Sequence, residues 1–468
     1  MESYSLSYAS LCGLAVVVAG WLLHCVYKWR NPPCNIGRLP PGSMGFPLVG
    51  ETFQFLRPSP SLDIPAFYKQ RLERYGRLFK TNLVGHPVVV SMDAEVNRFI
   101  FQQEGKLFRS WYPDTTNDLF GKESMVYYDG SVHKYVRSFA ARLFGIDSLR
   151  DVLFAEMEHS VTQNLAAWAT EPFIEVKDAV ATMIFDHMAK KLIGFGPDKS
   201  RKLRKNFDAF FQGMVSFPLY FPGTTFYGCI QGRKKLQNVL KDLLKERLST
   251  PQIRHGDFLD EVVDELRSGT GTMNEKFAVD FVAALLFGTF ATISSALAVG
   301  MSEEHEAILK KREDGRTGII WDEYKSMTFT AQVTNEIVRI SNVSPGIFRK
   351  ALTDVPVKGY TIPTGWLVMI SPMAIHLNPE LYEDPLTFNP WRWQDESKKS
   401  TLLKNFMPFG GGTGHCVGAE FSKIQIAIFL HTLVTNYRWK EIKGGDVQRI
   451  TEVVFPTGYH IQIIPREG

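Results

Sequence analysis

The chain has 468 residues, of which 44% are hydrophobic and 22% charged, and its formal net charge is only +4. This composition excludes a largely disordered protein, and so small a charge gives no indication of a nucleic-acid partner. The five cysteines are irregularly spaced, which argues against a disulfide framework and for a reducing compartment.

The first thirty residues predict a membrane anchor. Residues 11–26 are almost all apolar or small, and with their flanks they are just long enough to span a bilayer. A cleaved signal peptide is the alternative, but Glu2 is the only early charge and bulky residues occupy the end of the run. Lys28 and Arg30 follow directly, so the positive-inside rule keeps the remainder of the chain cytosolic.

Residues 31–50 contain two Pro-Pro pairs and four glycines, which predicts a stiff hinge rather than a helix. No second linker follows, so residues 51–468 are expected to form one catalytic domain behind the anchor at residues 1–30. The short β-like runs 79–84 and 87–91 predict a hairpin that turns at Gly85 and His86.

Helical periodicity dominates residues 148–265, with a loop at 217–225 and a new helix beginning near Gln231. Residues 274–301 are apolar nearly all round. A second membrane span is the alternative there, but small and hydroxyl-bearing residues in the middle favour a helix through the centre of a large domain. The fold class predicted is mainly α with a minor β portion.

Cys416 carries the strongest chemical signal. Four glycines crowd the six residues before it, and a helical run begins at Ala419. A thiol at a helix N-terminus is expected to have a lowered pKa, and glycines allow a flat macrocycle to lie against the loop. A thiolate in such a place suits a heme iron that activates oxygen. From these residues alone, a buried structural cysteine is an equally good interpretation.

Residues 405–418 resemble the heme-binding loop of the cytochrome P450 family, with Phe409, Gly412, Cys416 and Gly418 on pattern. Further runs of the family pattern follow in the expected order along the chain: His133–Arg137, Gly288–Thr292, Glu336–Arg339, Arg349 after Pro345, and Arg392 within residues 388–392. The resemblance covers essentially the whole chain. It implies the cytochrome P450 fold and heme b with Cys416 as the iron ligand. It also implies an endoplasmic reticulum membrane location and electrons from NADPH through NADPH–cytochrome P450 reductase.

The resemblance also implies a role for each matching residue. Glu336, Arg339 and Arg392 would form a buried network that fixes the cysteine loop, although a solvent-facing helix pair is the alternative for the first two. Arg137, His133 and Arg349 would neutralise the heme propionates, unless they are ordinary surface charges. Thr292 would hydrogen-bond the bound oxygen or a water, unless its hydroxyl bonds back to its own helix. Gly288 would leave room for oxygen.

Three positions depart from the family pattern. Ala291 stands where an acidic residue is usual, which leaves water or hydroxyls such as Ser294 to supply protons. Gly414 stands where an arginine is common, and His415 is its neighbour. About a dozen residues are missing after Met301, roughly three helical turns. These departures keep two alternatives open: a heme-thiolate isomerase or lyase that consumes no oxygen, and a catalytically impaired, heme-poor variant.

The runs 39–47, 221–225 and 388–393 resemble plant enzymes that oxidise sterols, brassinosteroids and triterpenoids. By analogy, the substrate would contact residues 108–120, 287–290, 343–348 and 454–458. These stretches are rich in Phe, Trp and Val, which suits an apolar polycyclic ligand, although plain core packing is the alternative. The function expected is a monooxygenase that hydroxylates a small apolar molecule of the sterol or triterpenoid class.

Overall fold

The computed structural model describes residues 2–113, 130–214, 219–269, 273–303, 321–344, 346–450 and 452–466. The chain divides into two compact units, each built from separate stretches of sequence. The first unit comprises residues 1–57, 65–109 and 347–371, and the second comprises residues 58–64, 110–346 and 372–468. The sequence-based division into residues 1–30, 31–50 and 51–468 stays a prediction.

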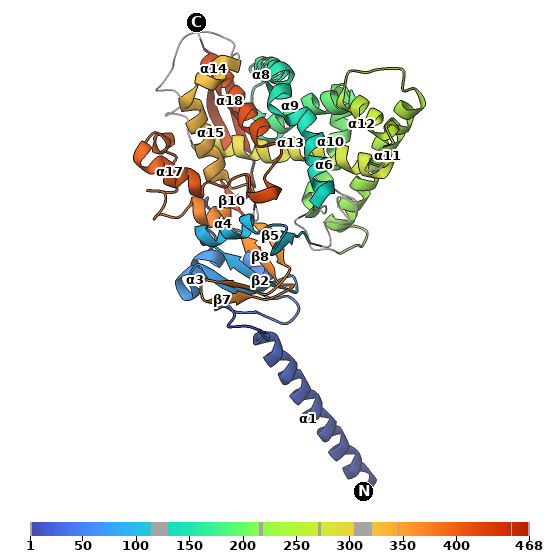
Figure 1. Cartoon of the computed structure of the whole chain (residues 1–468), viewed down its shortest axis with the longest axis vertical. Helices are drawn as coiled ribbons and strands as arrows, with labels where there is room; N and C mark the ends of the chain where they lie inside the picture. Colours follow the sequence, from blue (N-terminus) through green and yellow to red (C-terminus); the bar gives the residue numbers. More distant parts are fainter. Residues whose placement is uncertain are drawn as a thin grey trace. The chain divides into compact units, whose positions relative to one another are not determined.

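The first unit contains a five-stranded sheet with the strand order β1-β2-β8-β5-β3 and a separate β6–β7 hairpin. The elements of this unit are α1 (Glu2–Arg30), α2 (Thr52–Phe55), α3 (Ala66–Tyr75), β1 (Leu78–Leu83), β2 (His86–Ser91), α4 (Ala94–Gln102), β3 (Phe108–Ser110), β5 (Ile347–Ala351), β6 (Val355–Val357), β7 (Tyr360–Ile362) and β8 (Leu367–Ile370). Figure 1 labels many of them.

The predicted hairpin is present, with its turn one residue earlier than expected. β1 and β2 are antiparallel and pair Leu83 with His86, so Val84 and Gly85 form the turn. Their φ angles are 52° and 81°. Positive φ at both central residues is what a two-residue hairpin turn with the natural strand twist requires, and the glycine meets that requirement without strain.

α1 is a 29-residue helix whose described apolar side chains are largely exposed, including Val16, Trp21 and Leu23. The indole of Trp29 donates to the carbonyl of Met44 at 3.2 Å. Elsewhere in the described part of the chain, α13 (Glu275–Glu303) is long and apolar enough to cross a membrane, but its apolar stretch is 72% buried. α13 is therefore a core helix, as the polar residues in its middle predicted.

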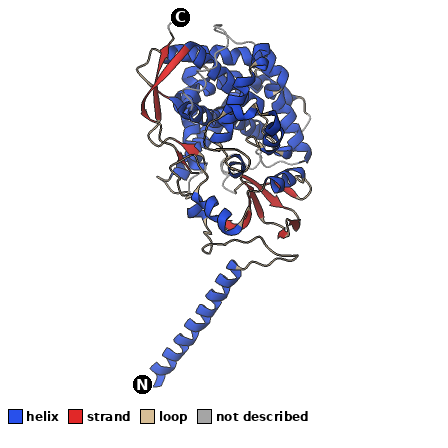
Figure 2. Cartoon of the chain, turned by 90° about the vertical axis from the view of Figure 1, so that its left-hand side faces the viewer, coloured by secondary structure: helices blue, strands red, loops and turns tan. Residues whose placement is uncertain are grey.

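Helices make up most of the second unit, as Figure 2 shows. Up to and including the long helix α13, its elements are α6 (Gly130–Phe144), α7 (Ile146–Ser148), the π-helical turn η2 (Leu149–Leu153), α8 (Phe154–Trp168), β4 (Ile174–Glu175), α9 (Val176–Ile193), α10 (Pro197–Met214), α11 (Thr225–Ser249) and α12 (Phe258–Arg267).

The C-terminal part of this unit carries Cys416, Glu336, Arg339 and Arg392. Its elements are α14 (Trp321–Ser326), α15 (Thr328–Ser341), α16 (Pro372–His376), η3 (Pro390–Trp393), α17 (Glu396–Asn405), η4 (Gly412–Gly414), α18 (Ala419–Asn436), β9 (Tyr437–Gly444), β10 (Gln448–Arg449), β11 (Val453–Val454) and β12 (Tyr459–Pro465).

α13 runs through the second unit and packs against α9, α11, α15 and α18 (Figure 1). Aromatic rings fill the contacts around it. Phe281 lies 5.6 Å from Phe139, and Phe290 lies 5.1 Å from Phe185, measured between ring centroids. Burying each such ring contributes about 1.5–3 kcal/mol, so α13 is held rigidly among its neighbours.

α11 begins at Thr225, not near Gln231 as the sequence predicted. The Thr224 side chain accepts the N–H of Tyr227 and caps the helix. Gly228 lies between the observed and the expected start, and it hid the first turns of the helix because glycine normally signals a loop. A Cβ atom on Gly232 would lie 2.9 Å from the carbonyl oxygen of Asn206, so this glycine allows α10 and α11 to approach closely.

Candidate active site

The loop that carries Cys416 connects α17 with α18. The N–H of Cys416 donates to the carbonyl of Phe409 at 3.0 Å. Gly410 and Gly412 have φ angles of 75° and 67°, a region that residues with a Cβ atom adopt at a cost. Gly418 is the N-cap of α18, and the Cys416 side chain is exposed beside it. The loop therefore presents a thiol at the start of a long buried helix.

The pKa of the Cys416 thiol is raised rather than lowered, which corrects the expectation from the sequence. Desolvation by protein packed around the sulfur is the largest cause, although the residue as a whole is exposed, and the Gly418 backbone N–H and the Arg137 charge oppose it. Arg137 comes from α6, and its guanidinium donates to the carbonyl of His415. The helix end and Arg137 thus favour the thiolate, but a bound metal cation is what would deprotonate the thiol outright.

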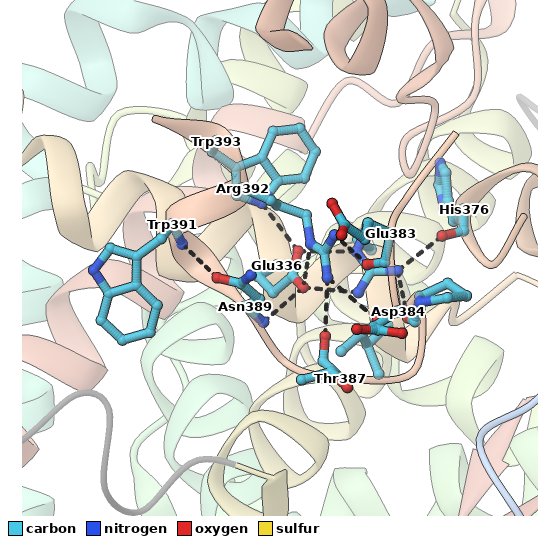
Figure 3. A network of polar contacts seen from close by, with 12 residues as sticks. Glu336, His376, Glu383, Asp384, Thr387, Asn389, Trp391, Arg392 and Trp393 are labelled. Carbon is cyan, nitrogen blue, oxygen red and sulfur yellow. Dashed lines mark hydrogen bonds and ion pairs between the residues drawn. The ribbon is translucent and has the colours of Figure 1, made fainter. Parts of the chain in front are cut away.

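Glu336 and Arg339 form a fully buried ion pair on α15, not the solvent-facing pair that was the alternative. Both side chains have 0% exposure, and the guanidinium donates to Glu336 Oε1 and Oε2 at 2.7 and 2.8 Å. Arg392 joins them from η3, with its Nε 3.0 Å from Glu336 Oε1 (Figure 3). The three residues grouped from the sequence therefore lie together.

Two further donors complete the hydrogen bonding of the Glu336 carboxylate. The indole N–H of Trp393 donates to Oε2 at 3.0 Å, and the backbone N–H of Asn389 donates to Oε1 at 2.9 Å. Arg392 also donates to the carbonyls of Glu383 and Thr387, at 2.8 and 3.1 Å. A buried carboxylate with this many donors is fully satisfied, so the network fixes the backbone of residues 383–393. The run 388–393 had been quoted for its resemblance, but the bond from Trp393 was not predicted.

Gly288 and Thr292 lie one helical turn apart on α13, and both are exposed. Space is open around Gly288, because a Cβ atom built there would meet no atom within 4 Å. The neighbouring hydroxyls of Thr289, Ser294 and Ser295 bond back to carbonyls of the helix. Within the described residues, the Thr292 hydroxyl donates no such bond. The space beside Gly288 and Thr292 is therefore compatible with the role in binding oxygen that the sequence predicted for them.

Ser294 does not share the face of Thr292. It is 1% exposed and donates to the carbonyl of Ala291 at 3.1 Å, and a two-residue step places it on the opposite side of the helix. The idea that Ser294 supplies protons beside Thr292 is wrong for this arrangement. Ala291 itself is 8% exposed, so the position that is usually acidic is here an apolar contact.

The residues predicted to meet the propionates lie in different units. His133 and Arg137 are four residues apart on α6 and therefore on one face of that helix. Arg349 lies on β5 in the first unit, where its guanidinium is 3.0 Å from Glu104 and both side chains are buried. An ion pair thus engages Arg349, and its role toward a propionate stays a prediction.

The region of the shortened junction is only partly described. The end of α13 is well anchored, because Met301 is buried and its carbonyl accepts the hydroxyl of Tyr459 at 3.3 Å. Residues 304–320, which follow the junction, lie outside the described residues. Gly414 is exposed in η4 beside the cysteine.

The predicted substrate-contacting stretches divide between core and half-buried positions. Phe290 is 4% exposed and packs on Phe185, so it belongs to the core rather than to a ligand surface. Phe287, Val343 and Phe455 are half-buried. Residues 114–120 and Pro345 lie outside the described residues.

Comparison with known proteins gives a consistent result. The family model described as "Cytochrome P450" matches residues 40–461. The chain is 49% identical to "Cytochrome P450 87A3" of Oryza sativa subsp. japonica, over 99% of this chain and 93% of that protein. It is 44% identical to "Beta-amyrin 16-alpha-hydroxylase CYP87D16" of Maesa lanceolata, over 97% of this chain and 98% of that protein. Further relatives are named as cholesterol and steroid hydroxylases.

A solved structure extends the likeness to three dimensions. The retinoic acid bound cyanobacterial CYP120A1 superposes with a TM-score of 0.82 at 26% identity, over 92% of this chain and all of that one.

Proposed function

Since the chain belongs to the cytochrome P450 family, we propose that it is a membrane-anchored heme-thiolate monooxygenase in which Cys416 binds the iron of heme b. The chain is a monooxygenase acting on apolar polycyclic substrates, as its relatives named as hydroxylases indicate. One observation carries the assignment of the thiolate: the glycine-rich loop, closed by the bond from Cys416 N–H to the Phe409 carbonyl, presents an exposed Cys416 two residues before the Gly418 N-cap of α18.

The residues around Cys416 fit a heme. The backbone at Gly418 does not crowd the cysteine sulfur, since even a Cβ atom built there would lie 3.9 Å from Sγ, an ordinary contact distance. Phe409 and Gly412 shape the loop, and Arg137 and His133 on α6 offer groups for the propionates. When bound, heme supplies the activation of oxygen and the transfer of one oxygen atom to a C–H bond. The protein contributes the thiolate, the pocket and the proton path.

Thr292 and Gly288 would carry the oxygen-side tasks. The Thr292 hydroxyl is exposed and is not committed to its own helix, so it is available to donate a proton or to hold a water. Gly288 keeps the adjacent turn clear. Ala291 adds no acid, so protons would reach Thr292 through water.

The electrons are expected to come from NADPH through NADPH–cytochrome P450 reductase, and the enzyme is expected to work at the endoplasmic reticulum membrane. α1 supports this location because a 29-residue helix exposes its apolar side chains along most of its described length. Lys28 and Arg30 in its last turn favour a cytosolic catalytic domain.

The specific substrate class proposed is a sterol or a triterpenoid. The relatives' names describe hydroxylations, which favours the monooxygenase over an isomerase or lyase that would consume no oxygen. An impaired, heme-poor variant remains the second candidate, because Gly414 replaces the usual arginine near the cysteine.

The deciding experiment is the carbon-monoxide difference spectrum of the reduced, membrane-expressed protein, with Cys416→Ser as the control. A red-shifted thiolate band in the natural chain alone supports Cys416 as the ligand. Incubation with β-amyrin, cholesterol, reductase and NADPH should then give hydroxylated product with matching consumption of oxygen and NADPH. Turnover without oxygen consumption would establish the isomerase, and absence of any heme band would establish the impaired variant.

A further inference from the structure

His376, at the end of α16, is a completely buried histidine with no role in the site described so far. Its exposed fraction is 0%, and its ring packs on Phe406 and Tyr382 with centroid distances of 5.5 and 6.5 Å. Its backbone carbonyl accepts Arg339 Nη1 at 2.8 Å, which places it beside the Glu336 network (Figure 3). A buried imidazole must satisfy both ring nitrogens, so its partners identify what it does.

The partners of the ring fix its tautomer. The backbone N–H of Met407 lies 3.0 Å from Nε2, and because an N–H can only donate, Nε2 must be the unprotonated acceptor. Nδ1 therefore carries the proton and donates to Asn342 Oδ1 at 2.8 Å. The hydrogen-bond network thus assigns the tautomer. Burial, assisted by the charge of Arg339, lowers the pKa of His376 to about 3, so the ring is neutral at working pH.

Asn342 is itself held in one orientation. It is the C-cap of α15 with a φ of 40°, in the left-handed region that asparagine tolerates better than most residues. Its Nδ2 donates back to the carbonyl of Arg339 at 2.5 Å, so its oxygen must face His376. The buried guanidinium of Arg449 donates to the carbonyls of Ile340 and Ser341 at 2.9 and 3.2 Å and secures the same helix end.

The other end of this chain of bonds reaches the cysteine. Met407 is the second residue after α17, and its carbonyl accepts the N–H of Gly410 at 3.1 Å. The carbonyl of Phe409 in that turn accepts the N–H of Cys416 at 3.0 Å. Each of these bonds lies within the second unit, so the path from Asn342 through His376 and Met407 to Cys416 is continuous.

We infer that His376 is a positioning residue for the cysteine loop: Asn342 holds its ring in the Nδ1–H tautomer so that Nε2 accepts Met407 N–H and sets the first turn of the loop. The importance of this positioning for catalysis rests on the proposed function, in which the Cys416 thiolate binds the heme iron. The hydrogen-bond relation itself can be tested without heme chemistry.

Three variants separate positioning from simple packing. His376→Gln can place an amide oxygen where Nε2 lies, whereas His376→Leu fills similar space without an acceptor. Asn342→Gly keeps the left-handed backbone and removes only the side chain that holds the tautomer. Amide exchange of the peptide that contains Met407, followed by mass spectrometry, reports the bond directly in the full-length holoprotein.

The expected result is exchange at Met407 about tenfold faster in His376→Leu, and within about twofold of the natural chain in His376→Gln. Asn342→Gly should be intermediate. The fraction of reduced protein with the red-shifted carbon-monoxide band should fall in the order natural, Gln, Leu at equal total heme. Equal exchange in the Gln and Leu variants would overturn the inference. A natural chain without the thiolate band would instead refute the proposed function, and the exchange comparison would still decide the role of His376.

Discussion

The indole N–H of Trp393 donates to Glu336 Oε2 at 3.0 Å, and Arg339 donates two further hydrogen bonds to the same carboxylate. An aromatic side chain from η3 is thus part of an ionic network on α15, and it carries both packing area and a hydrogen bond. Trp391, two residues away, is 40% exposed and packs on Phe329 instead. Variants of Trp393 and Trp391 can therefore be compared directly, since only Trp393 donates to Glu336.

Removing the carboxylate should be far more damaging than removing one donor. We expect Glu336→Gln to lower the free energy of unfolding by about 3–5 kcal/mol, because Arg339 and Arg392 would be left buried without a counter-charge. Trp393→Phe should cost about 1.5–3 kcal/mol, and Trp391→Phe should be close to neutral. Urea unfolding of the three variants measures this order, and equal losses in both tryptophan variants would contradict it.

Thr292→Ala should separate chemistry from stability. Because the hydroxyl is exposed and makes no helix bond in the described structure, the free energy of unfolding should change by less than about 0.5 kcal/mol. The ratio of product formed to NADPH consumed should fall about tenfold or more. Thr289→Ala is the control, since that buried hydroxyl bonds to Leu286 and its loss should affect stability rather than coupling. Unchanged coupling in Thr292→Ala would remove the residue from the proton path.

Two glycines of α11 should respond in opposite directions to alanine. Gly228 is exposed and has open space around it, so Gly228→Ala should stabilise the protein by about 0.5–1 kcal/mol through helix propensity. Gly232→Ala should destabilise it by about 1–3 kcal/mol, because the new Cβ atom meets the backbone of α10 at 2.9 Å. Thermal unfolding tests the contrast, and a stabilising Gly232→Ala would show that the helices separate easily.

Acid should destabilise the fold through two histidines, the buried His376 and the half-buried His187. Burial lowers the pKa of His376 to about 3 and that of His187 to about 4, from an ordinary value of 6.5. The unfolded chain takes up protons below pH 6.5 while the folded rings stay neutral, so stability falls as pH falls through this window. Each ring contributes up to about 1.4 kcal/mol per pH unit.

Urea unfolding between pH 7 and pH 4.5 measures that slope. His376→Gln removes one titrating group, so its stability should depend on pH by about one proton less than that of the natural chain. Parallel slopes in the two proteins would mean that the native His376 ring is protonated more easily than its burial implies.

Local patterns predicted much of the fold, while long-range contacts decided what they left open. The hairpin of β1 and β2 followed from two short β-like runs separated by Gly85 and His86, and α13 followed from an apolar run with a polar middle. The start of α11 was missed because Gly228, near the beginning of the helix, resembles a loop residue in the sequence. The pairing of Glu336 with Arg339 follows from helical spacing, but their complete burial depends on residues 383–393.

The site shows the same division. Sequence order grouped Cys416 with the Glu336 network, yet no local signal pointed to His376 or Asn342, whose partners lie more than thirty residues away. The pKa direction of Cys416 was wrong because a helix N-terminus is visible in sequence, whereas desolvation is a property of the assembled surroundings. The sequence also did not show that Ser294 and Thr292 lie on opposite sides of α13, because the exposed side of that helix depends on its neighbours.

The register of the first unit's sheet has a consequence for biosynthesis. β8 pairs in parallel with β2, with Leu367 opposite Val88, so the sheet joins segments made far apart in time. At about 5–20 residues per second, a ribosome needs on the order of tens of seconds to reach β8 after completing β2. Throughout that interval the hairpin has an open apolar edge. Nascent chains stalled before residue 367 should therefore aggregate or recruit chaperones, whereas chains extended past residue 371 should not.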